Sequence, residues 1–494
     1  MSTASSNTQP RHESGTLLVF YLLLLAGAIA SFWWIQRVGQ ELKAPVASAT
    51  STTSGMVKSG GVNVVVHVLA TLAAVIALGN LFAWVLKRFH QPAVIGEVIA
   101  GIVLGPSILG TFFPEAMHCL IPDASTDPHG LVVSSLKTIA QLGVVLYMFI
   151  VGLELNLQKV GRQAKAAIAI SHASIVVPFV LGALMALWLY PMLSTSDVPF
   201  TSFALFLGVA MSITAFPILA RILTDQRLDQ TDLGVIALSC AATDDVTAWC
   251  LLAFVVGVAK AQIGDAVIVA LATITFIAMM FLVVRPLMLR WIAWAELRGL
   301  DQRTTPLLLI ALLCAALATE AIGIHAVFGA FLLGAMIPHD SRVSKELTLK
   351  LHDVVTIMLL PAFFAITGMN TRIGLINGLD SWLICGAIIL LATLGKFGGT
   401  ILASRLMGID WQTSAALGIL MNTRGLMELI VLNIGLSLGV ISPKLFAMMV
   451  IMALATTIAT APILRKLISG GERHADQTQR NPTPSTGVVN GPLP

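Results

Sequence analysis

About fourteen long apolar runs constrain this chain more than any other feature of its sequence. Each run is roughly 20 residues long, which is enough for a helix to cross the roughly 30 Å hydrocarbon core of a bilayer. The chain is 57% hydrophobic and only 11% charged, whereas soluble domains carry about 25% charged residues. We therefore predict an all-α polytopic membrane protein with about 14 transmembrane helices. They are expected near residues 16–35, 63–86, 93–112, 131–155, 164–190, 202–223, 231–259, 265–289, 305–322, 324–338, 351–369, 376–404, 411–437 and 441–468.

Polar segments divide the chain into parts. Residues 1–14 are polar and residues 469–494 are rich in Gly, Pro and Ser, so both are expected to be disordered tails. An outer linker, 37–62, separates an additional N-terminal transmembrane helix, 15–36, from the main transmembrane domain, 63–468. The first helix ends in SFWWIQ rather than in small residues, which favours its retention over the alternative of a cleaved signal peptide.

Basic residues alternate between the two sides of this arrangement. With the N-terminus in the cytoplasm, most of the 29 Lys and Arg fall in segments that also face the cytoplasm. Cytoplasmic loops of membrane proteins carry an excess of these residues. The N- and C-termini are therefore both predicted to be cytoplasmic.

Asp244 and Asp245 stand side by side inside the seventh apolar run. An ionised carboxylate in hydrocarbon is costly, and each of two adjacent carboxylates raises the cost of charging the other. Such a pair needs a proton, a metal cation or a fixed positive group. Lys396, inside the twelfth run, is the best candidate partner; the alternative is that its ammonium extends to the membrane surface. A membrane site that needs a cation or a proton is what cation/proton exchange requires.

Two other runs contain residues that interrupt a helix. Pro217, in SITAFP, lacks a backbone donor inside the sixth run, and Asn-Thr-Arg-Gly at 422–425 interrupts the thirteenth. Non-helical backbone at membrane depth is tolerated only where protein or water shields it, and half-helix ends can then offer carbonyls to a cation. We predict two broken helices, with a simple proline kink as the alternative for the sixth run.

Arg424 and Glu428 are four residues apart, so they share a helix face if the helix resumes after Gly425. We interpret them as a structural ion pair, and a gating or proton role is the alternative. Spans three to seven and spans ten to fourteen each have their broken helix in fourth place. This order predicts two inverted five-helix repeats, which is a common plan among transporters.

The sequence contains no sign of enzymatic chemistry. We find no Gly-rich phosphate loop, no His/Cys ligand cluster and no nucleophile–base set. The five cysteines are scattered without CxxC spacing and are interpreted as small apolar residues. We therefore predict a protein that is not an enzyme, has no resident cofactor and binds no nucleic acid.

Taken together, these motifs resemble the monovalent cation/proton antiporter-2 family, most of all the plant cation/proton exchangers and their bacterial relatives. The matching segments, which lie within about 63–468, are VIGEVIAGIVLGPSILG, FIVGLELNL, SITAFPILARIL, AATDDVTAWCLLA, HAVFGAFLLGAMIP, LLPAFFAITGMNT, GKFGG and MNTRGLMELIVLNIGL. The resemblance implies a sodium/proton antiporter-like fold in which the two broken helices cross beside the acidic helix within a mobile six-helix core. It also implies a homodimer in the lipid bilayer of a bacterial inner membrane.

The resemblance also implies roles for individual residues. Asp245 would be the main carboxylate for the proton and for the monovalent cation, and so the metal ligand. Asp244 would pair with Lys396, and Thr214 would lend a backbone carbonyl near the crossing. The other candidate ligands beside the crossing are Ser212, Thr243, Asn422 and Thr423.

The sequence thus predicts a secondary active antiporter that exchanges Na⁺ or K⁺ for protons by alternating access around Asp245 and serves pH homeostasis. Both ions, and both electroneutral and electrogenic exchange, are compatible with the residues. The alternatives are a sodium-coupled organic-anion symporter on a similar fold, a non-transporting cation sensor and a channel-like leak. Only 26 residues follow the last span, without a Gly-rich fingerprint, so no nucleotide-binding domain is expected on this chain.

Overall fold

The computed structural model describes residues 12–45, 63–89, 91–123, 126–127, 129–154, 164–228, 231–260, 263–298 and 304–480. Within these ranges every regular element is a helix, which confirms the predicted all-α membrane protein. Twelve helical segments of this part of the chain are long and apolar enough to span a membrane, and a bent helix pair gives a thirteenth. The short apolar helix α14 (Ala326–Met336) occupies the place of the remaining predicted span.

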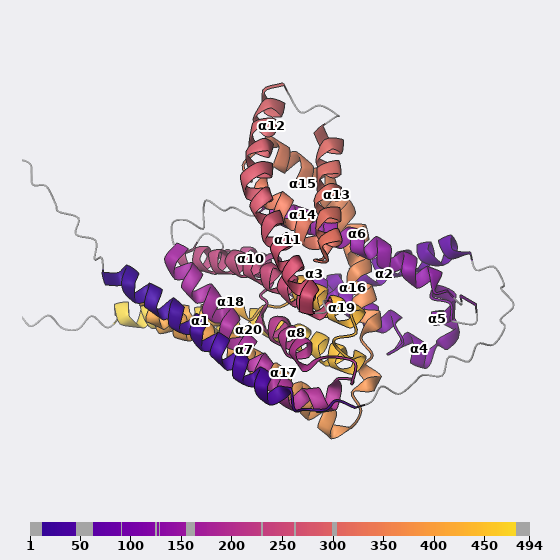
Figure 1. Cartoon of the computed structure of the whole chain (residues 1–494), viewed down its shortest axis with the longest axis horizontal. Coiled ribbons are helices and arrows are strands. Elements are labelled where there is room, and N and C mark those ends of the chain that lie inside the picture. Colours follow the sequence, from indigo (N-terminus) through magenta and orange to yellow (C-terminus); the bar gives the residue numbers. More distant parts are fainter. Residues whose placement is uncertain are drawn as a thin grey trace, which may run out of the picture.

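One group of helices forms what we call the scaffold (Figure 1). Its members are α2 (Val64–Lys87), α3 (Ala93–Leu104), α6 (Leu131–Glu154), α13 (Thr304–Ile322), α14, α15 (Arg342–Val354), the π-helical turn η3 (Val355–Leu359) and α16 (Leu360–Asn370). Within the scaffold, α6 packs against α14, and α3 packs against both α2 and α16. The short helices α4 (Leu109–Phe112) and α5 (Pro114–Leu120) follow α3.

A second group, which we call the core, carries the acidic pair and both helix breaks. Its members are α7 (Ala164–Leu193), α8 (Phe200–Ser212), α9 (Phe216–Asp225), α10 (Asp232–Lys260), α17 (Gly378–Leu406), α18 (Trp411–Met421), α19 (Leu426–Ser437) and α20 (Pro443–Arg480). Helix α7 packs against α8, α10 and α17, and α20 packs against α17, α18 and α19. Between core and scaffold in the chain lie α11 (Ile263–Met279), the π-helical turn η2 (Met280–Val284) and α12 (Arg285–Arg298), and a 3₁₀ turn, η4 (Ile373–Leu375), precedes α17.

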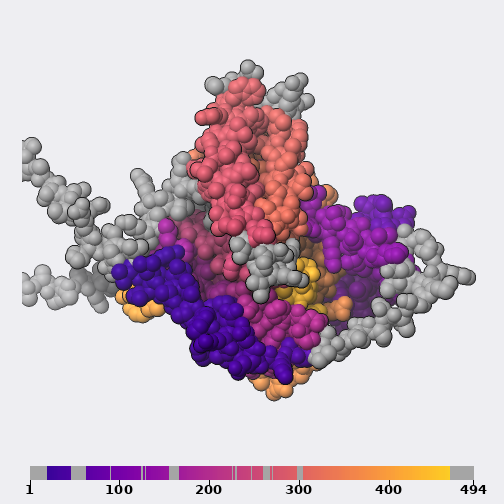
Figure 2. All heavy atoms as spheres, in the orientation of Figure 1, coloured from indigo at the N-terminus to yellow at the C-terminus, as the bar shows by residue number. Residues whose placement is uncertain are grey.

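The N-terminal helix α1 (His12–Gly39) lies on the surface of the molecule alongside α7 (Figures 1 and 2). The Tyr21 ring meets the His172 ring of α7 edge-on, with the ring centroids 5.2 Å apart. The other side of α1 exposes large apolar residues such as Leu23 and Ile29, as expected for a helix that faces lipid. At the other end of the chain, α20 continues through residues 469–480, which lie in the predicted C-terminal tail.

The sixth span contains a true break rather than a proline kink. Helix α8 ends at Ser212, residues 213–215 are non-helical, and α9 begins at Phe216. Pro217 therefore lies in the first turn of α9, where a missing backbone N–H costs no hydrogen bond. Helices α18 and α19 are likewise separated by residues 422–425 and bent by 41°.

The two breaks meet each other at the centre of the core. The backbone N–H of Ala215 donates to the Thr423 carbonyl across 2.9 Å, and Thr214 Oγ1 lies 3.0 Å from the Met421 carbonyl oxygen. Backbone groups released by one break are thus paired with groups of the other, which is how a membrane protein can hold irregular backbone away from water. The predicted crossing of two broken helices is confirmed.

Glycines allow the scaffold helices α6 and α14 to pack closely. A Cβ atom placed on Gly152 would overlap the Phe331 carbonyl oxygen, and one placed on Gly334 would overlap the Phe149 carbonyl oxygen. These neighbours are backbone atoms, which cannot swing aside as the end of a side chain can. Small residues at such contacts let transmembrane helices approach one another.

We therefore expect Gly152→Ala to destabilise the protein by about 1–3 kcal/mol, the usual cost of overpacking. The matched control is Gly386→Ala on α17, where a Cβ atom would meet nothing within 4 Å. Removing a helical glycine there should leave stability unchanged or raise it by about 0.5–1 kcal/mol. Thermal unfolding midpoints of the detergent-solubilised variants measure both effects. Equal midpoints for the two variants would contradict the close packing of α6 on α14.

Candidate functional site

Lys396 and Asp244 form a buried ion pair at the crossing. Lys396 Nζ lies 3.2 Å from Asp244 Oδ2, and the two side chains are 0% and 1% exposed. The same ammonium donates to Thr214 Oγ1 at 2.6 Å, and Thr214 Oγ1 lies 2.7 Å from Asp244 Oδ2. The three side chains come from α17, α10 and the α8–α9 break. A buried ion pair needs such additional hydrogen bonds to offset the loss of hydration.

Two serines of α7 complete the surroundings of Asp244. Ser171 Oγ donates to Asp244 Oδ1, and Ser174 Oγ lies 3.1 Å from Asp244 Oδ2. These serines are not among the site residues predicted from the sequence. Their spacing of three places both hydroxyls on one helix face, and this is the signal in the sequence that could have found them. The Asp244 carboxylate thus accepts hydrogen bonds from four side chains, those of Ser171, Ser174, Thr214 and Lys396.

Asp245 is held differently from its neighbour. Its side chain is 1% exposed, and its carboxylate accepts a hydrogen bond from the backbone N–H of Phe216, the first residue of α9. The N-terminus of a helix is a favourable place for a negative charge. Asp245 Oδ1 is buried and has no hydrogen-bond partner among the described residues. A buried oxygen of this kind is costly unless a proton or a cation occupies it.

The other candidate ligands divide into two kinds. Asn422 Oδ1 and Thr423 Oγ1, in the α18–α19 break, are buried without a hydrogen-bond partner among the described residues. Ser212 Oγ donates to the Val209 carbonyl, and Thr243 Oγ1 donates to the Ser239 carbonyl, each at 2.8 Å within its own helix. A hydroxyl that donates in this way still has lone pairs for a cation. The unpaired atoms of Asn422 and Thr423 are the more available ligands.

Arg424 and Glu428 form a second buried pair. Arg424 Nη1 lies 3.4 Å from Glu428 Oε2, and both side chains are 0% exposed. Arg424 itself precedes α19, which begins at Leu426, so the pair spans the helix start rather than two turns of one helix. The guanidinium also donates to the Ala210 and Met211 carbonyls, at 3.1 and 2.8 Å, at the C-terminal end of α8.

The two charges suit the helix ends that they face. A helix C-terminus carries partial negative charge, which the Arg424 guanidinium neutralises at α8. Glu428 lies in the first turn of α19, where the partial charge of the backbone is positive. The pair therefore places a positive charge at the C-terminal end of α8 and a negative charge at the N-terminal end of α19.

Comparison with known proteins decides the family. The family model described as "Sodium/hydrogen exchanger, transmembrane" matches residues 72–466, which is most of the chain. The chain belongs to this family. It is a family of transporters rather than of enzymes. The chain is similar to the Na(+)/H(+) antiporter NhaS4 of Synechocystis sp., with 43% identity over 409 residues that cover 82% of this chain and 98% of the relative.

Two less similar relatives are longer than this chain. Cation/H(+) antiporter 17 of Arabidopsis thaliana is 37% identical over 454 residues, which cover 90% of this chain and 54% of the relative. K(+)/H(+) antiporter 1 of Saccharomyces cerevisiae is 33% identical over 396 residues, which cover 78% of this chain and 43% of the relative. The chain thus spans about half the length of these two proteins.

A solved structure confirms the predicted fold. The structure of the sodium proton antiporter MjNhaP1 from Methanocaldococcus jannaschii superposes with a TM-score of 0.50 and 14% sequence identity. The match covers 83% of this chain and 98% of the archaeal one. The protein therefore has the predicted sodium/proton antiporter-like fold.

Proposed function

We propose that this protein exchanges a monovalent cation, Na⁺ or K⁺, for protons across a membrane by alternating access around Asp245. The observation that carries the proposal is the buried Oδ1 atom of Asp245 at the crossing of the two broken helices, which has no hydrogen-bond partner in the described part of the chain. A proton or a cation bound at this atom would offset the free-energy cost of burying it without a partner, so the proton and the cation compete for one carboxylate. The printed names of the relatives, which are Na(+)/H(+), cation/H(+) and K(+)/H(+) antiporters, agree with this exchange.

The surrounding residues have separate tasks in this proposal. Asp245, with Asn422 and Thr423, offers oxygen atoms that replace part of the hydration shell of the cation. Asp244 and Lys396 form an ion pair beside it, and Arg424 with Glu428 neutralises the half-helix ends. The core would carry the site past the scaffold, so that Asp245 faces one side of the membrane at a time.

The Lys396–Asp244 pair determines the stoichiometry. If the pair stays closed, one proton moves for each cation and exchange is electroneutral. If a cation opens it, Asp244 exchanges its lysine partner for a proton, and two protons move per cation. One net charge then couples to the membrane potential at about 2.3 kcal/mol per 100 mV. Measuring exchange in liposomes at clamped potentials separates the two cases.

We propose further that the protein works as a homodimer in the bacterial inner membrane, with both termini in the cytoplasm. The distribution of Lys and Arg between alternate loops supports this orientation.

Purified protein in liposomes with a pH-sensitive dye tests the proposed function. After a pH gradient is imposed, Na⁺, K⁺ or Li⁺ is added with no organic solute present. We expect at least one of these ions to dissipate the gradient in a saturable way. Dissipation only when an organic anion is added would point to a symporter. No response to any ion would favour a non-transporting sensor, and flux at rates of ion channels would show a leak.

Thr214→Ala should slow this exchange by about tenfold or more, because a hydrogen bond to a charged group is worth about 1.5–3 kcal/mol. The variant removes the hydroxyl that joins Lys396 to Asp244. The matched control is Thr214→Ser, which keeps the hydroxyl and should retain most of the wild-type rate. The initial rate of cation-driven proton flux in liposomes is the measurement. Equal rates for the Ala and Ser variants would show that the hydroxyl has no part in exchange.

A further inference from the structure

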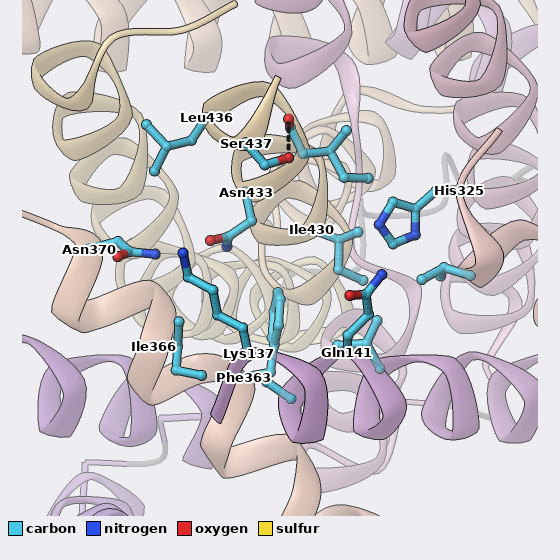
Figure 3. A pocket seen from close by; sticks show the side chains of 14 residues that line it. Lys137, Gln141, His325, Phe363, Ile366, Asn370, Ile430, Asn433, Leu436 and Ser437 are labelled. Atoms are coloured by element: carbon cyan, nitrogen blue, oxygen red, sulfur yellow. Dashed lines mark hydrogen bonds between the residues drawn. The ribbon is translucent and has the colours of Figure 1, made fainter. Parts of the chain in front are cut away.

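A cavity of about 270 Å³ lies between the core and the scaffold, on the face of the molecule where α6 begins and α19 ends (Figure 3). Helices α6 and α16 and the start of α14 line it from the scaffold, and α19 lines it from the core. Its polar lining residues are Lys137, Gln141, His325, Asn370, Asn433 and Ser437.

Lys137 gives this cavity its charge. Among the described lining residues it is the one with a permanent charge, and it makes no ion pair within the described part of the chain. Figure 3 shows the end of its side chain beside the amides of Asn370 and Asn433. A cation that entered the cavity would meet neutral amides and one ammonium group, and no carboxylate of the described lining.

A short series of neighbouring residues links the cavity lining to Asp245. Phe331 of α14 stacks on Trp249 of α10, with the ring centroids 6.2 Å apart, and both side chains are buried. Trp249 follows Asp245 by one helical turn, and Phe331 lies one turn from Val327, which lines the cavity. One helical turn on α14, one ring contact and one helical turn on α10 thus join the cavity lining to Asp245.

The opposite end of α6 carries an acidic residue. Tyr147 lies further along α6, away from the cavity. Helix α6 ends there at Glu154. Among the described residues, the two ends of α6 thus differ in charge, with the Lys137 ammonium near its start and the Glu154 carboxylate at its end.

We propose that Lys137 makes the two sides of the transporter unequal. On its own side of the membrane, the Lys137 ammonium repels an arriving cation and raises the cation concentration needed for half-maximal exchange. It leaves the equilibrium of exchange unchanged, because a fixed charge on the route does not alter the free energies of the two solutions. This inference rests on the proposed function. In the orientation proposed above, Lys137 faces outward, so the protein captures cations from the cytoplasm at lower concentrations than from outside.

The test uses right-side-out and inverted membrane vesicles, whose orientation is assigned by protease cleavage of a C-terminal tag. The cation concentration for half-maximal proton flux is measured from each side. We expect Lys137→Gln to lower this concentration about three- to tenfold on the Lys137 side, as expected for one unit charge in partly hydrated surroundings. The value on the other side should not change. Lys137→Arg should keep the wild-type value, and Lys137→Glu should lower it further.

The matched control is Lys444→Gln, at the start of α20 on the same face but outside the cavity lining. This variant should leave the cation concentration for half-maximal proton flux unchanged on both sides. Equal shifts on both sides, no shift, or the same shift in Lys444→Gln would overturn the proposal. Absence of exchange in the wild type would instead overturn the proposed function.

Should Lys137→Gln fail to assemble, wild-type protein in neutral lipid supplies the test. Added N-methylglucamine chloride should screen Lys137 and lower the half-maximal concentration on its side alone, and an unchanged value would overturn the proposal.

Discussion

Asp245→Asn is expected to reduce cation-driven proton flux to the rate of protein-free liposomes while leaving the fold intact. The asparagine side chain has nearly the size of the aspartate and can still accept the hydrogen bond from Phe216. It carries no negative charge and binds no proton at neutral pH. A dehydrated cation would then lose its one charged ligand, and the exchange would lose the group for which cation and proton compete.

The matched control is Asp340→Asn, which removes a carboxylate that is 80% exposed. This variant should exchange at the wild-type rate. A second readout separates loss of binding from loss of fold. A saturating cation should raise the unfolding temperature of the wild type, since ligand at 100 times its Kd adds about 2.7 kcal/mol of stability. Asp245→Asn should unfold at the same temperature with and without the cation. Retained exchange in this variant would remove Asp245 from the centre of the proposal.

The number and kind of helices could be predicted because apolar length is dictated by the bilayer. The ends of the helices could not be predicted, because hydropathy identifies only the part of a helix that lies within the membrane. The span expected at 351–369 is part of a longer helical segment that begins at Arg342. Its first residues, RVSKELTLK, are polar but form helices readily, so the helix extends beyond the apolar part.

The charged members of the site could be predicted because charges within lipid are rare and need partners. The serines could not, because hydroxyls are common in transmembrane helices and often bond their own backbone. The different surroundings of Asp244 and Asp245 also lie beyond local sequence. Neighbouring residues point about 100° apart around a helix, and only the packed core shows that Asp244 faces α7 and α17 while Asp245 faces α9.

Arg424→Met is expected to destabilise the protein by about 3–5 kcal/mol, the cost of leaving one partner of a buried ion pair alone. Methionine fills most of the volume but removes every donor of the guanidinium. Both Glu428 carboxylate oxygens lack hydrogen-bond partners among the described residues, so Arg424 is the compensation for their charge. The Ala210 and Met211 carbonyls would lose their donors as well. The thermal unfolding midpoint in detergent is the measurement, and Arg372→Met, at an exposed arginine, is the surface control, expected within about 0.5 kcal/mol of wild type.

The double variant Arg424→Met with Glu428→Leu identifies the cause of this loss. If the uncompensated carboxylate is responsible, removing it should restore most of the stability, because apolar residues can replace a buried ion pair at little cost. If the double variant is as unstable as Arg424→Met alone, the guanidinium acts mainly by capping the α8 carbonyls. A single variant as stable as the wild type would contradict both explanations. The comparison therefore distinguishes a charge that balances Glu428 from a charge that holds the end of a broken helix, two roles that the same arginine fills in the structure.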